Sequence, residues 1–465
     1  MMARHILACT AALLVSLAGP ADNADAQKRP LETPREARLS IAPARLPVPA
    51  LKHRLLPPVA EQGPGNAATV YLAAFPAGAE VDFDTVEGFL ATPLDDLPKT
   101  GAASYVARFA DALRLLDVAG HRSFCQWDDA IREEGLRLSL RHVRNGRLLG
   151  RLLALRIRLE IRDGRHDDAL RSLQAGFALA RAYNTGTPFL YAMASSDSDG
   201  IEKVLFDVLR EWAEAPGSPN LYWALANLPR PFHDPRQALE IEEASVYFTF
   251  PDLRRPEQLT AQRAEQLMED MWRLIGGQSD APAARKAAAD YVQRMLPRAR
   301  EWLAQSTGDA SRAGAMPEAA AVLCHMVAEY RREVDEMYKW AGMPYWQASE
   351  GLGKSVARFH DTKTDNPLLT LVPRVTSQLL MFAIRERESA LLQCVEALRA
   401  HAAAHEGRFP ASLEELAPDT PAPPDPVLGK PFEYRLEGGI VILKAVSPRP
   451  GFKGSEREYR ISVRR

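Results

Sequence analysis

Two amphipathic helical patterns joined by a short turn restrict the fold of this chain more than any other feature. Apolar residues repeat every three or four positions in 148–159 and in 169–180, on either side of Asp163-Gly164. The stripes consist of Leu148, Leu152, Leu155, Leu159, Ala169, Leu173, Phe177 and Ala180. This spacing places the apolar side chains on one face of each helix. The two faces can bury each other, which predicts an αα-hairpin over 147–183.

Helical spacing continues through most of the middle of the chain. Further helices are expected at 201–214, 236–248, 256–275, 281–303, 317–341 and 367–405, between clusters of proline or glycine. The hairpin resembles a single tetratricopeptide unit, with Gly164 and Ala169 at its small positions, but no second copy follows at a period of ~34 residues. We expect a mainly α helical domain over 65–380, built from tetratricopeptide-like hairpins.

The pattern changes after His405. Two alternating runs, 431–436 and 440–446, flank a Gly438-Gly439 pair that can supply the positive φ angles of a tight turn. A third alternating run covers 458–463. We therefore expect residues 381–465 to form a small α+β module, a helix followed by a three-stranded antiparallel sheet.

The first 26 residues have the layout of a cleavable secretory signal peptide. A positive start, Met1–His5, precedes a short apolar run, Ile6–Gly19, and Ala24 and Ala26 occupy the positions that signal peptidase reads. The alternative is a lipoprotein signal at Cys9, although only three apolar residues precede that cysteine. The sequence predicts export to the periplasm or the medium, with no stable membrane span after cleavage.

Residues 27–64 are rich in proline. The prolines are Pro30, Pro34, Pro43, Pro47, Pro49, Pro57, Pro58 and Pro64. Each fixes its own φ angle and disfavours helix at the residue before it. We expect this segment to be an extended, disordered tether between the signal peptide and the helical domain.

Charge and cysteine content limit the partners and the covalent links. Lys and Arg number 58 and Asp and Glu 60, so the net charge of −2 attracts no polyanion, and no nucleic-acid partner is expected. After signal cleavage Cys125, Cys324 and Cys394 remain. Three cysteines are too few to cross-link a chain of this length, which favours small buried apolar residues and leaves one disulfide open.

A candidate binding cleft consists of Trp127, Asp128, Arg156, Tyr222 and Trp223. Aromatic rings beside charged groups are typical of ligand clefts, but large aromatic residues in helical proteins also fill cores. Both interpretations stay open from the sequence alone. Catalytic residues are not identified, since the chain has no Gly-x-Ser-x-Gly elbow and no His-Glu-x-x-His motif.

Three other patterns suggest ligands without completing a site. Residues 348–355 satisfy a loose phosphate-loop expression, but no apolar strand precedes them. Residues 195–200 match half of a calcium loop. The pairs His401/His405 and His325/Glu329 have helical spacing without a third ligand. We expect neither a metal nor a cofactor.

The end of the chain resembles a known module. The pattern consists of Gly407, Phe409, Pro410, Leu413, Leu416, Asp425, Pro426, Gly429, Pro431, Phe432 and Tyr434. Residues 391–443 thereby resemble the globular end of type II secretion major pseudopilins, which implies a shared α+β module. In pseudopilins this helix begins the chain as a membrane-spanning segment, whereas several hundred residues precede it here.

The middle of the chain has a second resemblance. It rests on 65–68 (Gly-Asn-Ala-Ala), 125–128 (Cys-x-Trp-Asp), 151–156 (Arg-Leu-Leu-Ala-Leu-Arg) and 220–225 (Asn-Leu-Tyr-Trp-Ala-Leu). Residues 66–243 are thereby similar to an uncharacterised exported helical family frequent in planctomycete-type bacteria. The resemblance implies export and a helical fold and assigns no chemistry.

Together these features favour a non-catalytic exported protein that interacts with other envelope or extracellular proteins. The alternatives are an exported hydrolase with an unrecognised active site, and a component associated with secretion. The sequence leaves open whether the protein is an enzyme and favours the view that it is not.

Overall fold

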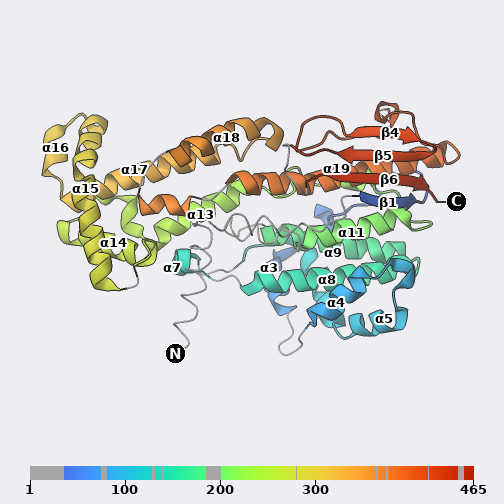
Figure 1. The fold of residues 1–465 in the computed structure, drawn as a ribbon. Coiled ribbons are helices and arrows are strands. Elements are labelled where there is room, and N and C mark those ends of the chain that lie inside the picture. Colours follow the sequence, from blue (N-terminus) through green and yellow to red (C-terminus); the bar gives the residue numbers. More distant parts are fainter. Residues whose placement is uncertain are drawn as a thin grey trace.

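The computed structural model is mainly helical, with a small sheet near the C-terminus (Figure 1). It describes residues 36–74, 81–127, 131–138, 141–184, 200–278, 280–361, 365–372, 375–416, 418–448 and 455–464. The buried apolar side chains in these ranges form three clusters. Two clusters define helical bodies, called here the N-terminal lobe and the middle lobe, and the third lies under the sheet. The predicted fold class is confirmed at this level.

The N-terminal lobe surrounds a core of residues between Leu55 and Leu228. Its helices are α3 (Ala67–Ala73), α4 (Phe83–Ala91), α5 (Lys99–Ala107), α6 (Ala110–Gly120), α8 (Arg141–Arg162), α9 (His166–Asn184), α11 (Ile201–Glu214) and α12 (Tyr222–Ala226). Two short parallel strands, β2 (Gly63–Asn66) and β3 (Arg122–Phe124), lie beside α3.

Helices α8 and α9 form the predicted αα-hairpin. Leu152, Leu155, Leu173 and Phe177 have no exposed surface, so the two predicted stripes lie inside the lobe. The turn between the helices contains Gly164 at φ 69°, a left-handed conformation that only glycine adopts without strain. Helix α11 packs across both members of the hairpin.

The middle lobe surrounds a core of residues between Ala238 and Ile384. Its helices are α13 (Pro235–Thr249), α14 (Ala261–Leu274), α15 (Ala281–Thr307), α16 (Ala310–Ala315), α17 (Glu318–Tyr338) and α18 (Tyr345–Asp361). The short helix α7 (Ile131–Glu134) packs against α13. Side chains of Asp234, Thr260 and Asp280 accept hydrogen bonds from the first turns of α13, α14 and α15, which explains where these helices begin.

The sheet has the strand order β1-β6-β5-β4. The predicted strands β4 (Glu433–Glu437), β5 (Ile440–Ala445) and β6 (Arg457–Val463) are antiparallel neighbours. Gly438 and Gly439 close the β4–β5 hairpin with φ angles of 57° and 81°, as their positions predicted. The buried face of the sheet packs on helix α19 (Val375–Ala404).

A fourth strand, β1 (Glu36–Ile41), corrects the expectation of a disordered tether over residues 27–64. It pairs in parallel with β6, and Leu39 and Ile41 are buried under the sheet. Residues 36–41 contain no proline and alternate Ala37, Leu39 and Ile41 with polar side chains, so they can join a sheet. Residues 27–35 and the predicted signal peptide, with Ala24 and Ala26, lie outside the described residues.

Helix α19 connects all three clusters. Val375, Leu379 and Ile384 lie in the core of the middle lobe. Leu392 lies in the core of the N-terminal lobe, and Leu391 and Leu398 pack under the sheet. The predicted boundary at residue 381 therefore falls inside a continuous helix. In Figure 1 this helix runs from the middle lobe to the sheet.

One helical stretch among the described residues, Pro367–Ala404, is long and apolar enough to cross a membrane. Of its most apolar window, 75% is buried inside the molecule. The helix also carries the buried charged side chains of Arg387, Glu388 and Arg399, which pair within the protein. These features are those of a core helix.

Candidate functional site

Among the described residues of the predicted cleft, Tyr222 and Trp223 lie together, whereas Trp127 belongs to a different core cluster. Trp127 is buried in the N-terminal lobe, where its ring stacks on Tyr71 at 6.0 Å between centroids and meets Tyr183 edge-on at 4.9 Å. Its Nε1 donates to the carbonyl of Ala182 at 2.9 Å. This side chain therefore fills the core, and its neighbour Asp128 lies outside the described residues.

Arg156 links two helices. It projects from α8 and donates two hydrogen bonds, of 2.6 and 3.0 Å, to the carboxylate of Asp117 on α6. Its side chain is 17% exposed and that of Asp117 43%, so the pair lies at the edge of the lobe. A bidentate pair of this kind fixes the angle between the helices.

Tyr222 and Trp223 lie at the other side of the N-terminal lobe, against the sheet module. The hydroxyl of Tyr222 donates to the carbonyl of Pro421 at 2.7 Å, and the two rings meet edge-on at 5.0 Å. Tyr222 is buried in the cluster under the sheet and Trp223 packs against it. The Tyr222 hydroxyl thus binds the protein's own backbone.

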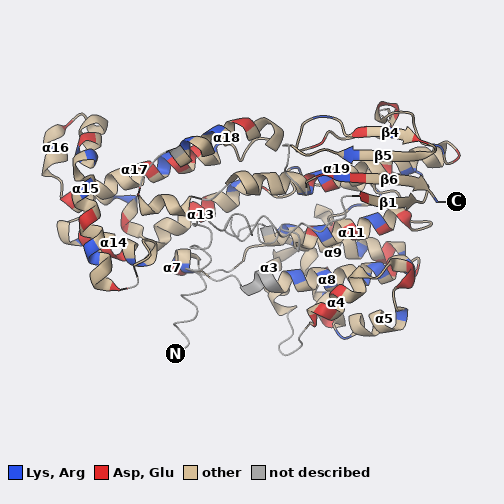
Figure 2. Ribbon diagram, viewed as in Figure 1, with Lys and Arg blue, Asp and Glu red and all other residues tan. Residues whose placement is uncertain are grey.

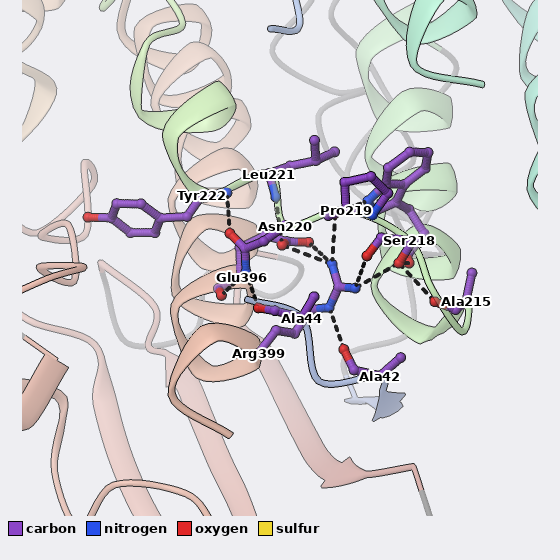
Figure 3. Close-up of polar contacts among 11 residues, drawn as sticks. Ala42, Ala44, Ala215, Ser218, Pro219, Asn220, Leu221, Tyr222, Glu396 and Arg399 are labelled. Carbon is purple, nitrogen blue, oxygen red and sulfur yellow. Dashed lines mark hydrogen bonds and ion pairs between the residues drawn. The ribbon is translucent and has the colours of Figure 1, made fainter. Parts of the chain in front are cut away.

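The residues just before Tyr222 belong to a buried network around Arg399 (Figure 3). Arg399 is fully buried and donates to the carboxylate of Glu396 at 2.8 and 2.9 Å and to the carbonyls of Ala42 and Ser218. Glu396 in turn accepts from the backbone N–H of Leu221 at 2.9 Å. The network joins the segment after β1, the loop before α12 and helix α19. Asn220 and Leu221 of the 220–225 pattern thus have structural roles.

The other ligand-like patterns do not form sites in the described residues. Residues 348–355 lie inside helix α18, where Lys354 pairs with Glu350 at 2.6 Å, so no phosphate loop exists. The rings of His401 and His405 stack at 3.9 Å, and no group of three potential metal ligands occurs in the described part of the chain. Residues 195–199 lie outside it.

The cysteines are separated. Cys125 packs against the core of the N-terminal lobe, Cys324 lies in the core of the middle lobe and Cys394 lies under the sheet. Burial raises the pKa of Cys324 to about 11 and that of Cys394 to about 12, so both stay thiols at neutral pH. They act as small apolar residues, the interpretation that the sequence favoured.

Charged groups of both signs alternate over the lobes (Figure 2). The arginines that follow the leucine stripe of α8 bind the protein itself. Arg158 donates to the carboxylate of Glu211 at 2.7 Å and to the carbonyl of Phe89 at 2.6 Å, and Arg151 pairs with Glu87. Arg151 and Arg158 are therefore engaged within the N-terminal lobe.

A cavity of about 50 Å³ lies between the lobes, and we call it the interlobe cavity. The chain crosses between the lobes here twice, through residues 228–235 and through the middle of α19. The lining residues are Phe177, Glu202, Phe206, Leu228, Pro229, Arg230, Phe232, His233, Phe382, Arg385, Glu386, Ser389, Ala390 and Pro426. Junctions between domains are common places for ligand sites.

The walls of the interlobe cavity carry titratable groups. Glu202 and His233 are 3% and 5% exposed, and the Oε2 of Glu202 lies 2.6 Å from the Nε2 of His233. Glu386 accepts a hydrogen bond from the backbone N–H of Phe232 at 3.3 Å. Burial raises the pKa of Glu386, and the nearby Glu202 carboxylate also raises it. The interlobe cavity thus brings together residues of both lobes and several buried or partly buried ionisable groups.

Sequence reasoning missed these residues, although one signal was present. Glu202 precedes Leu205 and Phe206 by three and four positions, so it lies on the buried face of α11. A carboxylate on such a face must find a partner inside the protein. The partner, His233, lies on a loop 31 positions later, and only the tertiary structure brings it there.

No family model, curated protein or solved structure matches this chain.

Proposed function

We propose that this protein is an exported, non-catalytic protein that binds other envelope or extracellular proteins. The observation that carries the proposal is the fate of the predicted cleft residues. The polar atoms of Trp127, Arg156 and Tyr222 bind the protein's own carbonyl or carboxylate groups at 2.6–3.0 Å. Side chains used in this way organise a scaffold and leave no catalytic constellation among them.

The sheet offers a surface for a partner. Strand β4 lies at the outer edge, with no further strand beside it in the described sheet, and four of its five residues are exposed. Leu436 and Ile440, beside the hairpin turn, are 40% and 44% exposed. An edge strand with exposed apolar residues can accept an extended segment of another protein as an additional strand.

The two modules support the same function. The α8–α9 hairpin is proposed to be tetratricopeptide-like, a type of unit that serves in protein interaction. The C-terminal module is proposed to be pseudopilin-like, and residues of that pattern have clear structural roles. Asp425 accepts two hydrogen bonds from buried Arg387, and the Tyr434 hydroxyl donates to the carbonyl of Pro410 at 2.6 Å.

The test is site-specific photo-crosslinking of the full chain in its native cell. We expect a cross-linker at Ile440 to capture a discrete envelope protein, whereas one at Val59, 84% exposed in the N-terminal lobe, captures none. Capture at Ile440 should fall at least tenfold when Leu436 is changed to Asp. Equal capture at the two positions, or a full-length precursor retained in the cytoplasm, would contradict the proposal.

The hydrolase alternative has one specific observation in its favour. Glu202, His233 and Glu386 place a carboxylate–imidazole pair and a second carboxyl in one cavity, and paired groups of this kind can act as acid and base. Turnover of an ester, glycoside or peptide substrate by the full chain, lost in Glu202→Gln, would support the hydrolase and count against the non-catalytic proposal.

A further inference from the structure

The interlobe cavity combines buried charges of opposite sign. Glu202 and Arg385 are 3% and 5% exposed, Glu386 is partly buried, and Arg230 is exposed at the rim. Arg230 donates one hydrogen bond, of 2.6 Å, to the side chain of Gln393. A guanidinium group has five N–H donors, so the group can bind a second acceptor.

The carboxylate groups that line the interlobe cavity can also accept further hydrogen bonds. Oε1 of Glu386 accepts the backbone N–H of Phe232. A carboxylate has two oxygens and about four acceptor positions, so Glu386 can accept more hydrogen bonds. Glu202 lines the same cavity and is engaged with His233 at 2.6 Å. A ligand cation beside Glu386 would therefore lie near two carboxylates.

Apolar rings complete the walls. Phe177, Phe206, Phe232 and Phe382 line the cavity, and the rings of Phe177 and Phe232 meet edge-on at 5.9 Å. A volume of about 50 Å³ is room for roughly four water-sized groups. The ligand must therefore be small, with charged ends and little polar surface between them.

A ligand with one charge fits this lining poorly. An anion would bring its charge toward Glu202 and Glu386, and a simple cation would bring its charge toward Arg230 and Arg385. A zwitterion satisfies both signs at once. We propose that the interlobe cavity binds a small zwitterion of the α-amino-acid class, with its ammonium group at Glu386 and its carboxylate at Arg230.

The experiment compares three probes on the full chain by isothermal titration calorimetry and thermal unfolding. Glycine carries both charges, methylammonium only the positive one and acetate only the negative one. We expect glycine to bind at least tenfold more tightly than either single-charge probe and to raise the melting temperature. Equal affinities for the three, or binding of one single-charge probe alone, would overturn the proposal.

Variants locate the site. Glu386→Gln keeps an acceptor for the N–H of Phe232 and removes the charge, so glycine affinity should fall at least tenfold while acetate affinity does not fall. Glu350→Gln, on the exposed surface of α18, is the matched control and should bind glycine like the unchanged chain. If Glu386→Gln fails to fold, Ser389→Val fills the cavity without changing its charge and should abolish binding. Wild-type glycine affinity in a folded cavity variant would refute the assignment.

Discussion

Single buried arginines hold distant parts of this chain together. Arg387 and Arg399 have no exposed side-chain surface, although arginine is rarely buried without partners. Arg387 pairs with Asp425 in the C-terminal module, and Arg399 binds carbonyls of the segment after β1 and of the loop before α12. Each guanidinium joins segments that the sequence separates by tens or hundreds of residues.

Removing the Arg399 guanidinium should be strongly destabilising. Arg399→Met leaves Glu396 buried without its cation, and a broken buried pair costs about 3–5 kcal/mol. Urea unfolding followed by circular dichroism measures the change in the free energy of unfolding. Arg171→Met is the control, because its pair with Asp168 is exposed and should contribute less than about 1 kcal/mol. Similar losses of unfolding free energy in both variants would show that burial does not make the Arg399 pair more important than an exposed pair.

Glu388 gives the fold a dependence on pH. Burial alone raises the pKa of this carboxyl, but the guanidinium groups of Arg457 and Arg210 more than offset burial and hold it below its usual range. A carboxyl whose pKa is lower in the folded state stabilises the fold above its unfolded pKa of about 4.3. This stabilisation is lost as the pH falls through the folded value.

The prediction concerns Glu388→Gln. Its deficit in unfolding free energy, relative to the unchanged chain, should be largest near pH 7 and should shrink as the pH falls below about 4. Urea unfolding over a pH series measures it. Glu406→Gln, whose side chain is 89% exposed, should show no such trend. A deficit for Glu388→Gln that is constant with pH would contradict the assignment.

At the scale of elements, helix α18 contains two glycines with different surroundings. Its Gly351 and Gly353 belong to the phosphate-loop-like run, yet both lie inside the helix. A Cβ atom at Gly351 would lie 2.1 Å from the ring of Trp340, whereas a Cβ at Gly353 would meet no atom within 4 Å. Gly351 therefore allows the close approach of Trp340, and Gly353 has no such role.

These two glycines make a matched experiment. Gly351→Ala should cost about 1–3 kcal/mol because the Trp340 ring must move. Gly353→Ala should stabilise the fold by about 0.5–1 kcal/mol, since alanine favours helix over glycine. Chemical denaturation of both variants measures the change in the free energy of unfolding. A change of the same sign in both variants would show that Trp340 does not pack on Gly351.

At the scale of the whole molecule, α19 makes the two lobes and the sheet interdependent. Leu391, Val395 and Leu398 on this helix lie under the sheet, and Val375 and Leu379 lie in the middle lobe. A single rigid helix shared by several cores transmits the loss of one core to the others. This central position explains why α19, although it belongs to the one described stretch long and apolar enough to cross a membrane, is a core helix.

Leu391→Ala tests this coupling. Leu391 has no exposed surface, so the truncation should cost about 2–5 kcal/mol. We expect hydrogen exchange to accelerate in β5 and also in the helices of both lobes, when measured by mass spectrometry. Leu303→Ala, buried in α15 at the far end of the middle lobe, should accelerate exchange mainly near its own site. Acceleration confined to the sheet in Leu391→Ala would show that the cores unfold independently.

The sequence by itself determined most of the helices, the α8–α9 hairpin and three of the four strands of the C-terminal sheet. An apolar stripe such as Leu152 and Leu155, or a turn such as Gly438-Gly439, involves only a few neighbouring residues. The periodicity of a sequence indicates local geometry of this kind. The same reasoning left both a cleft and a core role open for Trp127 and Tyr222, and it assigned Glu36–Ile41 to a tether. It could not decide further, because the packing partners of these residues are far away in the sequence.

Only the tertiary structure decided which segments meet. The pairing of β1 with β6 joins residues more than 400 positions apart, and the contact of Glu202 with His233 joins a helix to a loop. Such contacts depend on which buried surfaces complement each other across the whole chain, and no local pattern records that choice. For this reason the helical class of the protein is evident in its sequence, while the interlobe cavity became visible only in the folded molecule.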